Sequence, residues 1–252
     1  MTYTRVSIYV LLIFQSILSM EENNLATTRL TNIITQKKTL LGLSINLSSL
    51  KNILPYIPQA APHICCIKIN MEKLNYNDKW DTINTIKALS ILNNFMLIVG
   101  EKNNNYTENC TWADFTTASN LKEVETAKTI LLREEIKAPR GVFIKVQQLN
   151  IVTPHATNVI LEKIKNNQDP FITGITHITD ISHKNSNKIK ISEEEIPLNL
   201  NIERLYPLLK YRIVLRRTDI CLLNVSNSFE LSKVPHLAKF YFDYYESTNF
   251  IK

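Results

Sequence analysis

Short apolar runs alternate with segments of helical periodicity along nearly the whole chain, and this alternation limits the folds available to it. The apolar runs cover residues 41–45, 63–70, 95–99, 112–117, 141–146, 171–175, 188–191 and 220–225. Helical spacing of apolar residues covers residues 50–57, 80–94, 121–136, 156–165 and 234–245. Strands that alternate with helices form a mainly parallel sheet. Eight such runs in 252 residues predict a single-domain α/β protein, a TIM (β/α)8 barrel.

We expect residues 1–24 to be an apolar leader, followed by a barrel domain over residues 25–252. Arg5 precedes an apolar run from Val6 to Leu18, which is shorter than the about 20 residues of a spanning helix. We therefore expect no stable membrane span. Two interpretations stay open: a leader helix on a cytoplasmic protein, or a signal peptide over residues 1–20 whose cleavage yields a secreted protein.

Composition disfavours several classes of site. Glycine is scarce, and the chain has only Gly42, Gly100, Gly141 and Gly174. Loops that hold nucleotide phosphates depend on glycine for close backbone approach, and no Gly-x-Gly-x-x-Gly follows the first run. The net charge of +6 is spread along the chain without a dense Lys/Arg stripe, so we expect no nucleic-acid partner.

The four cysteines predict no metal site. They are Cys65, Cys66, Cys110 and Cys221. Their spacing contains no Cys-x-x-Cys and no Cys/His pair of the kind that binds zinc. Cys65 and Cys66 lie in an apolar run, where a free cysteine behaves as a small hydrophobic residue. We therefore expect reduced cysteines in the core.

Four segments together resemble one enzyme family. They are Arg29 to Ser44, Ile64 to Asn70, Thr111-Trp-Ala-Asp114 and Thr218 to Leu223. In order and spacing they resemble orotidine 5′-phosphate decarboxylase, in the form found at the C-terminal half of eukaryotic UMP synthase, over about residues 25–245. The resemblance implies a TIM barrel, a homodimer and a lyase of pyrimidine biosynthesis. It also implies decarboxylation of orotidine 5′-phosphate to UMP with no metal and no organic cofactor.

The third-strand motif of the family, Asp-x-Lys-x-x-Asp, is only partly present. It aligns with the stretch that runs from Gly100 to Asn105. Lys102 matches the lysine that protonates the product carbon, whereas Gly100 and Asn105 stand where the family has its two acids. Glu101 is adjacent, but a one-residue offset on a strand points a side chain to the other face. The motif therefore keeps its lysine and loses both carboxylates.

The other strand ends show the same loss. Ser44 is followed by Asn46, where the family has an Asp, and Lys68-Ile-Asn70 stands where the family has Lys-Thr-His. Val225 replaces the phosphate-binding arginine after the last strand, which removes a bidentate phosphate partner. Three glutamates, Glu193 to Glu195, stand where the family has a neutral loop and would repel a phosphate.

These losses predict a degenerate, catalytically inactive member of the family that acts as a binding or structural protein. Each preorganised charged group is typically worth about 3–4 kcal/mol of transition-state stabilisation, and three carboxylates are missing. The alternative is an active lyase. Lys68 and Lys102 have two interpretations: solvated lysines at strand ends, or cations that bind a small anion or nucleotide at the barrel mouth.

Overall fold

A computed structural model of the chain describes residues 26–71, 79–100, 111–133, 140–146, 171–177, 189–192, 195–214 and 219–249. The expected leader, residues 1–24, and the expected helix over residues 156–165 lie outside this set. Within the described residues, no helix has both the length and the apolar character that a membrane crossing requires.

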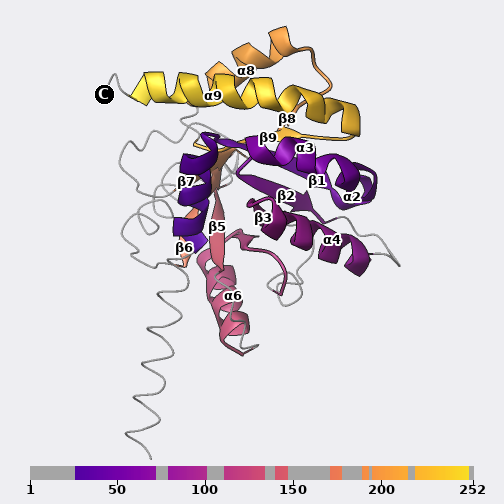
Figure 1. Ribbon diagram of the computed structural model, residues 1–252. Coiled ribbons are helices and arrows are strands. Elements are labelled where there is room, and N and C mark those ends of the chain that lie inside the picture. Colours follow the sequence, from indigo (N-terminus) through magenta and orange to yellow (C-terminus); the bar gives the residue numbers. More distant parts are fainter. Residues whose placement is uncertain are drawn as a thin grey trace, which may run out of the picture.

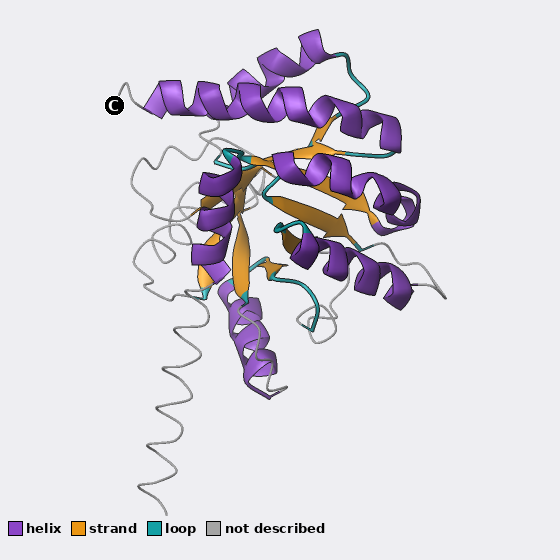
Figure 2. Ribbon diagram, viewed as in Figure 1, coloured by secondary structure: helices purple, strands orange, loops and turns teal. Residues whose placement is uncertain are grey.

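A curled sheet of parallel strands forms the centre of the molecule (Figures 1 and 2). The strands are β1 (Leu41–Asn46), β2 (Cys66–Asn70), β3 (Met96–Gly100), β4 (Phe115–Ala118), β5 (Gly141–Val146), β6 (Ile172–His177), β7 (Ile189–Ser192), β8 (Ile196–Pro197) and β9 (Cys221–Asn224). Their order in the sheet is β7-β6-β5-β4-β3-β2-β1-β9-β8. Each predicted run overlaps one of these strands, which confirms the α/β class. The two-residue β8 was not predicted.

The sheet closes on itself where β7 meets the residue before β9. Ile191 pairs in parallel with Ile220. The Ile220 N–H donates to the Lys190 carbonyl at 2.9 Å, and the Ser192 N–H donates to the Ile220 carbonyl at 3.1 Å. Further along, β8 pairs with β9 on the same side, with Ile196 opposite Leu223. The segments β7 and β8 therefore act as one interrupted barrel strand beside β9.

Helices connect and cover the strands. They comprise a helix over residues 26–37, α2 (Leu47–Ile53), η1 (Leu54–Tyr56), α3 (Ile57–Ala60), η2 (Ala61–His63), α4 (Lys79–Leu92), α6 (Leu121–Arg133), α8 (Ile202–Val214), η3 (Ser228–Lys233) and α9 (Val234–Asn249). Figure 1 shows α8 and α9 together across the top of the barrel, beside β8 and β9. Among the aromatic side chains of α9, Tyr241 is fully buried, and the others are partly buried against the core.

Two helices differ from the sequence prediction. A helix was expected over residues 50–57, but α2 begins at Leu47 and ends at Ile53, and a 3-10 turn with Pro55 follows. Proline lacks the N–H that would continue the α-helical ladder. The helix α8 was not predicted, and it contains Pro207 in its interior.

Aromatic rings fill part of the barrel interior, and two glycines make room for them. Phe115 and Phe143 are fully buried and meet edge to face, with ring centroids 5.1 Å apart. A Cβ atom at Gly141 would lie 2.9 Å from the Phe115 ring, and one at Gly174 would lie 2.7 Å from the Phe143 ring. The interior beside β4, β5 and β6 is therefore closed by packing. The expected core cysteines Cys65, Cys66 and Cys221 are buried and free; Cys110 lies outside the described residues.

Lys37 joins three segments at the amino ends of the first strands. Its Nζ donates to the carbonyls of Ala61 at 2.7 Å, Asn93 at 2.9 Å and Ile64 at 3.1 Å. The end of the helix over residues 26–37 is thereby tied to η2 and to the turn before β3. This is the stabilising face of a barrel rather than the face that carries chemistry.

Asp114, the last residue of Thr111-Trp-Ala-Asp114, also stabilises the end of the barrel that is formed by the amino ends of the strands. It accepts hydrogen bonds from the Leu97 N–H at 2.8 Å and from Arg140 at 3.4 Å. Arg29 lies 3.7 Å from the same carboxylate. Burial raises the pKa of Asp114, while the Leu97 N–H and the charge of Arg140 act to lower it. The Asp114 carboxylate therefore connects the amino-terminal ends of β3, β4 and β5.

Replacing Gly174 by alanine should destabilise the protein by about 1–3 kcal/mol, because overpacked cores lose stability in this range. The new Cβ would lie 2.1 Å from the Ile189 carbonyl oxygen, which is backbone and cannot turn aside. The matched control is Gly42→Ala, whose closest neighbours are the side-chain atoms Cys66 Sγ at 2.6 Å and Leu222 Cδ2 at 2.8 Å. Urea unfolding measures both, and equal losses would contradict this account of the β6–β7 contact.

Lys37 should make stability depend on pH. Burial lowers the pKa of Lys37 from its usual 10.5 to about 8. Below pH 8 the amine is charged in the folded and the unfolded chain, so its desolvation cost is fully present. Between these two pKa values the folded chain releases a proton that the unfolded chain keeps, so this contribution to the free energy of unfolding rises with pH. In urea unfolding, the free energy of unfolding of the protein should rise relative to that of Lys37→Gln between about pH 8 and about pH 10. A constant difference would disprove the linkage.

Candidate functional site

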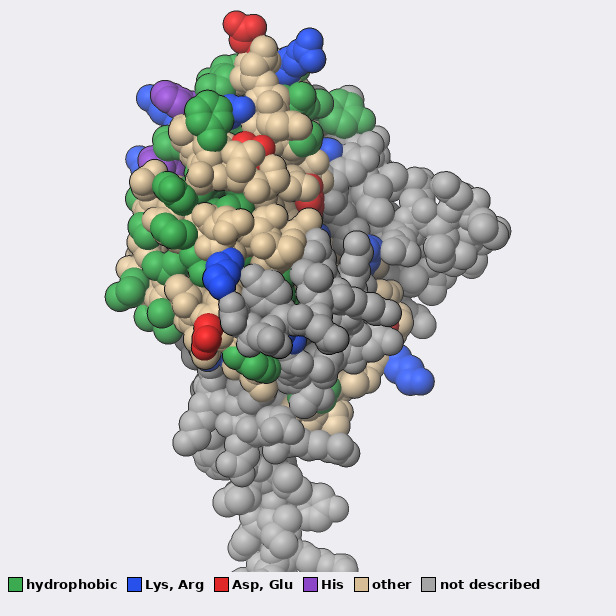
Figure 3. Space-filling model, turned by 90° about the vertical axis from the view of Figure 1, so that its right-hand side faces the viewer, with side chains coloured by type: hydrophobic (Ala, Val, Ile, Leu, Met, Phe, Trp, Pro, Cys, Tyr) green, Lys and Arg blue, Asp and Glu red, His purple; other side chains and the backbone are tan. Residues whose placement is uncertain are grey.

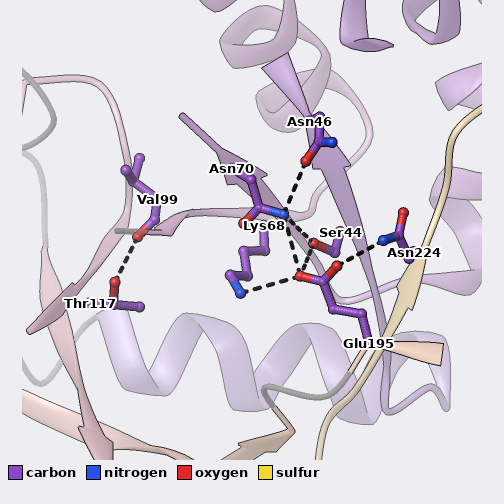
Figure 4. Close-up of polar contacts among 8 residues, drawn as sticks. All are labelled: Ser44, Asn46, Lys68, Asn70, Val99, Thr117, Glu195 and Asn224. Carbon is purple, nitrogen blue, oxygen red and sulfur yellow. Dashed lines mark hydrogen bonds and ion pairs between the residues drawn. The ribbon is translucent and has the colours of Figure 1, made fainter. Parts of the chain in front are cut away.

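Polar side chains gather at the carboxyl ends of β1, β2 and β9, the end of a barrel where ligands bind. The register pairs Ser44 with both Lys68 and Asn224, and it pairs Asn46 with Asn70. Because residues two apart on a strand point to the same face, these side chains project together. Figure 4 shows them directed toward a common centre.

The carboxylate of Glu195 occupies that centre. Its Oε1 accepts hydrogen bonds from Ser44 Oγ at 2.5 Å, Lys68 Nζ at 3.3 Å and Asn70 Nδ2 at 3.3 Å. Its Oε2 accepts from Asn224 Nδ2 at 3.0 Å. Four donors from three strands therefore hold one carboxylate (Figure 4).

The amide of Asn70 extends the network. It donates to Ser44 Oγ at 3.0 Å and to Asn46 Oδ1 at 3.4 Å. Ser44 is fully buried, whereas Asn46 and Asn224 are exposed. The network thus runs from the barrel interior to its surface.

The ion pair at the centre is largely removed from water. The side chains of Lys68 and Glu195 are 14% and 17% exposed. Their attraction is therefore screened less than on an open surface, but both groups have lost hydration. The hydrogen bonds from Ser44, Asn70 and Asn224 offset that loss for the carboxylate.

The strand β8 places Glu195 in the mouth. Glu195 directly precedes β8, which pairs with β9, and the Leu198 N–H donates to the Asn224 carbonyl at 3.2 Å. Lys233 at the end of η3 donates to the carbonyls of Leu198 at 2.6 Å and Leu200 at 2.8 Å. Residues 195–200 are therefore fixed on the barrel wall by backbone pairing and by Lys233.

Several residues predicted for the site are brought together. They are Ser44, Asn46, Lys68 and Asn70. Gly100 is the last residue of β3 and pairs with Asn70, so it lies at the same level of the barrel without a side chain. Val225 does not join them, because its side chain is buried in the core and its N–H donates to the Ser44 carbonyl at 3.0 Å. Lys102, Glu101 and Asn105 lie outside the described residues.

One expectation about charge was wrong. Lys68 is neither a solvated lysine nor a cation that has lost its carboxylate, because it is mostly buried and paired with Glu195. Glu195 was expected in an acidic loop, and the structure places its carboxylate inside the cluster, where it accepts hydrogen bonds. No local pattern in the sequence singles out Glu195 among the three glutamates, and the pairing of β8 with β9 places it at the cluster.

A further hydrogen bond joins β4 to β3. The hydroxyl of Thr117 on β4 donates to the Val99 carbonyl on β3 at 3.3 Å (Figure 4). In the described part of the chain, no group of three or more His, Cys, Asp or Glu side chains could hold a metal ion. On the face shown in Figure 3, the described Lys and Arg side chains are scattered among uncharged ones rather than gathered in a stripe.

Comparison with known proteins gives the fold. No protein-family model matches the sequence, and a search of curated proteins found no match. Thiamine phosphate pyrophosphorylase from Pyrococcus furiosus superposes with a TM-score of 0.54 at 12% identity, over 83% of this chain and 98% of that one. The chain is a TIM barrel. Orotidine 5′-phosphate decarboxylase from Pyrococcus horikoshii OT3 superposes with a TM-score of 0.51 at 11% identity, over 81% of this chain and 99% of that one. At such identities the likeness shows the fold alone.

The Lys68–Glu195 pair should be energetically coupled. Removing one partner of a buried ion pair leaves an uncompensated charge, so Lys68→Met and Glu195→Gln should each cost about 3 kcal/mol. The double variant should lose less than the sum, with a coupling energy of about 1–3 kcal/mol from urea unfolding.

The control is the exposed pair Lys128–Glu125 on α6, whose atoms are 3.1 Å apart and whose glutamate side chain is 70% exposed. Its coupling should stay below about 0.5 kcal/mol. If the losses of unfolding free energy in Lys68→Met and Glu195→Gln simply add in the double variant, the ion pair itself contributes nothing to stability.

Proposed function

We propose that this chain is an orotidine 5′-phosphate decarboxylase-like barrel that no longer decarboxylates orotidine 5′-phosphate and acts as a binding or structural protein. The observation that carries the proposal is the Glu195 carboxylate on Lys68, 3.3 Å from its Nζ. Lys68 matches the family's second-strand lysine, and the Glu195 carboxylate already lies against it. A phosphate ester that entered this mouth would therefore meet the negative charge of Glu195. Like charges at such distances repel, and the repulsion is larger out of water.

The neighbouring strand ends support the same conclusion. The resemblance places catalytic acids at Asn46 and Gly100, and neither residue carries a carboxylate. Asn46 accepts a hydrogen bond from Asn70, so its amide belongs to the polar network. The missing charges are of the preorganised kind, each typically worth about 3–4 kcal/mol in the transition state.

The experiment is a direct assay. Purified protein is incubated with orotidine 5′-phosphate while the ultraviolet absorbance of the pyrimidine is followed, with the Pyrococcus horikoshii enzyme as positive control. We expect no turnover above the buffer rate. Turnover near that of the control enzyme, abolished by Lys102→Ala, would falsify the proposal.

One observation favours the alternative, an active carboxy-lyase. The Lys68–Glu195 pair keeps a lysine next to a carboxylate, as in the family's alternating charges, although the acid stands just before β8 rather than on the first or third strand. Under this alternative the assay shows turnover, and Glu195→Gln lowers it by a factor of about 10² to 10³. An unchanged rate in Glu195→Gln would remove Glu195 from the mechanism.

The resemblance also suggests a homodimer. Analytical ultracentrifugation of the full chain tests this independently of activity. A single species of 29.1 kDa at all concentrations would argue against it.

A further inference from the structure

The donors around Glu195 belong to the sheet itself. Ser44, Lys68 and Asn224 stand at paired positions on β1, β2 and β9, and Asn70 follows two residues after Lys68. Backbone pairing fixes their relative positions whether or not Glu195 is present. The arrangement combines an ammonium, a hydroxyl and two amide groups, which is a donor set suited to a carboxylate.

Glu195 approaches these four hydrogen-bond donors from a segment that is not part of the paired strands. It lies between β7 and β8 and takes no place in either strand. Its side chain contributes only acceptors, and its two oxygens accept all four hydrogen bonds. The donors therefore make the site, and Glu195 fills it as a ligand would.

We infer that the carboxyl ends of β1, β2 and β9 form a binding site for a small carboxylate, which Glu195 occupies from within the chain. A free carboxylate would use the same donors, Ser44, Lys68, Asn70 and Asn224, and binds them only where the Glu195 side chain is absent. The inference stands apart from the proposed function, because it holds whether or not the barrel decarboxylates any substrate.

The variant Glu195→Ala tests the inference by opening the site. The substitution removes the Cγ methylene and the carboxylate, and acetate consists of the same two carbons and two oxygens. At pH 7 and constant ionic strength, Glu195→Ala should melt at a lower temperature than the parent in chloride. Acetate should then recover most of that loss in a saturable way, because a ligand that binds only the folded state raises the midpoint.

The size of the anion provides a second criterion. Formate lacks the methyl group that would replace Cγ and should recover less. Propionate carries one methylene more and would overlap the Cβ that remains at position 195, so it should also recover less. A response of equal size to inorganic phosphate would overturn the assignment of the site to carboxylates.

Three controls isolate the donor set. The parent protein and Glu195→Gln, whose amide fills the same space, should not respond to acetate beyond matched chloride. The double variant Lys68→Met/Glu195→Ala should lose the acetate response. Equal acetate responses in the single and the double variant would exclude Lys68 from the site, and with it the proposal.

If Glu195→Ala does not fold in chloride, the same comparison is made on refolding. Recovery of folded protein is then measured by circular dichroism in acetate and in chloride. Recovery that depends on acetate supports the site, and equal recovery in both salts overturns it.

Discussion

The short backbone pairing between Ile191 and Ile220 is the contact on which the arrangement of the barrel depends, because it joins the two ends of the curled sheet. Asp219 strengthens this closure. Its carboxylate accepts a hydrogen bond from the Lys190 N–H at 2.8 Å and another from the Tyr245 hydroxyl at 2.8 Å. The helix α9 is thereby tied to the same closure. Only a closed ring brings β8 beside β9, and only that pairing carries Glu195 to the ends of β1 and β2.

The site illustrates how the charge of a mostly buried lysine at a barrel mouth is balanced. The resemblance places acids on the first and third strands, where this chain has Asn46 and Gly100. A mostly buried lysine without an anion would be costly, and Glu195 supplies that anion from the interrupted seventh strand. The requirement for a counter-ion comes from burial rather than from catalysis, so it persists in a barrel whether or not a reaction does.

Much of the fold followed from the sequence because strands of a parallel barrel are buried on both faces and read as continuous apolar runs. The run at 95–99 is of this kind, and the run at 41–45 has an apolar residue at every second position. β8 was not predicted because two residues carry no periodicity, and α8, which contains Pro207, was not predicted either. The strand-end positions of Ser44, Asn46, Lys68 and Asn70 were also predictable. Glu195 was not, because its bond to Ser44 spans 151 residues and depends on the register of β8.

The pairing of β1 with β9 has a consequence for biosynthesis. β1 begins at Leu41, and the strand that covers its free edge begins at Cys221. During translation, β1 can pair with β2 early, but its other edge stays open until residues 221–224 have left the ribosome. Contacts of such large sequence separation form late in folding, and an open apolar strand edge is a template for intermolecular pairing. The nascent chain therefore passes through a long period in which β1 needs protection from aggregation, by a chaperone or by the growing barrel itself.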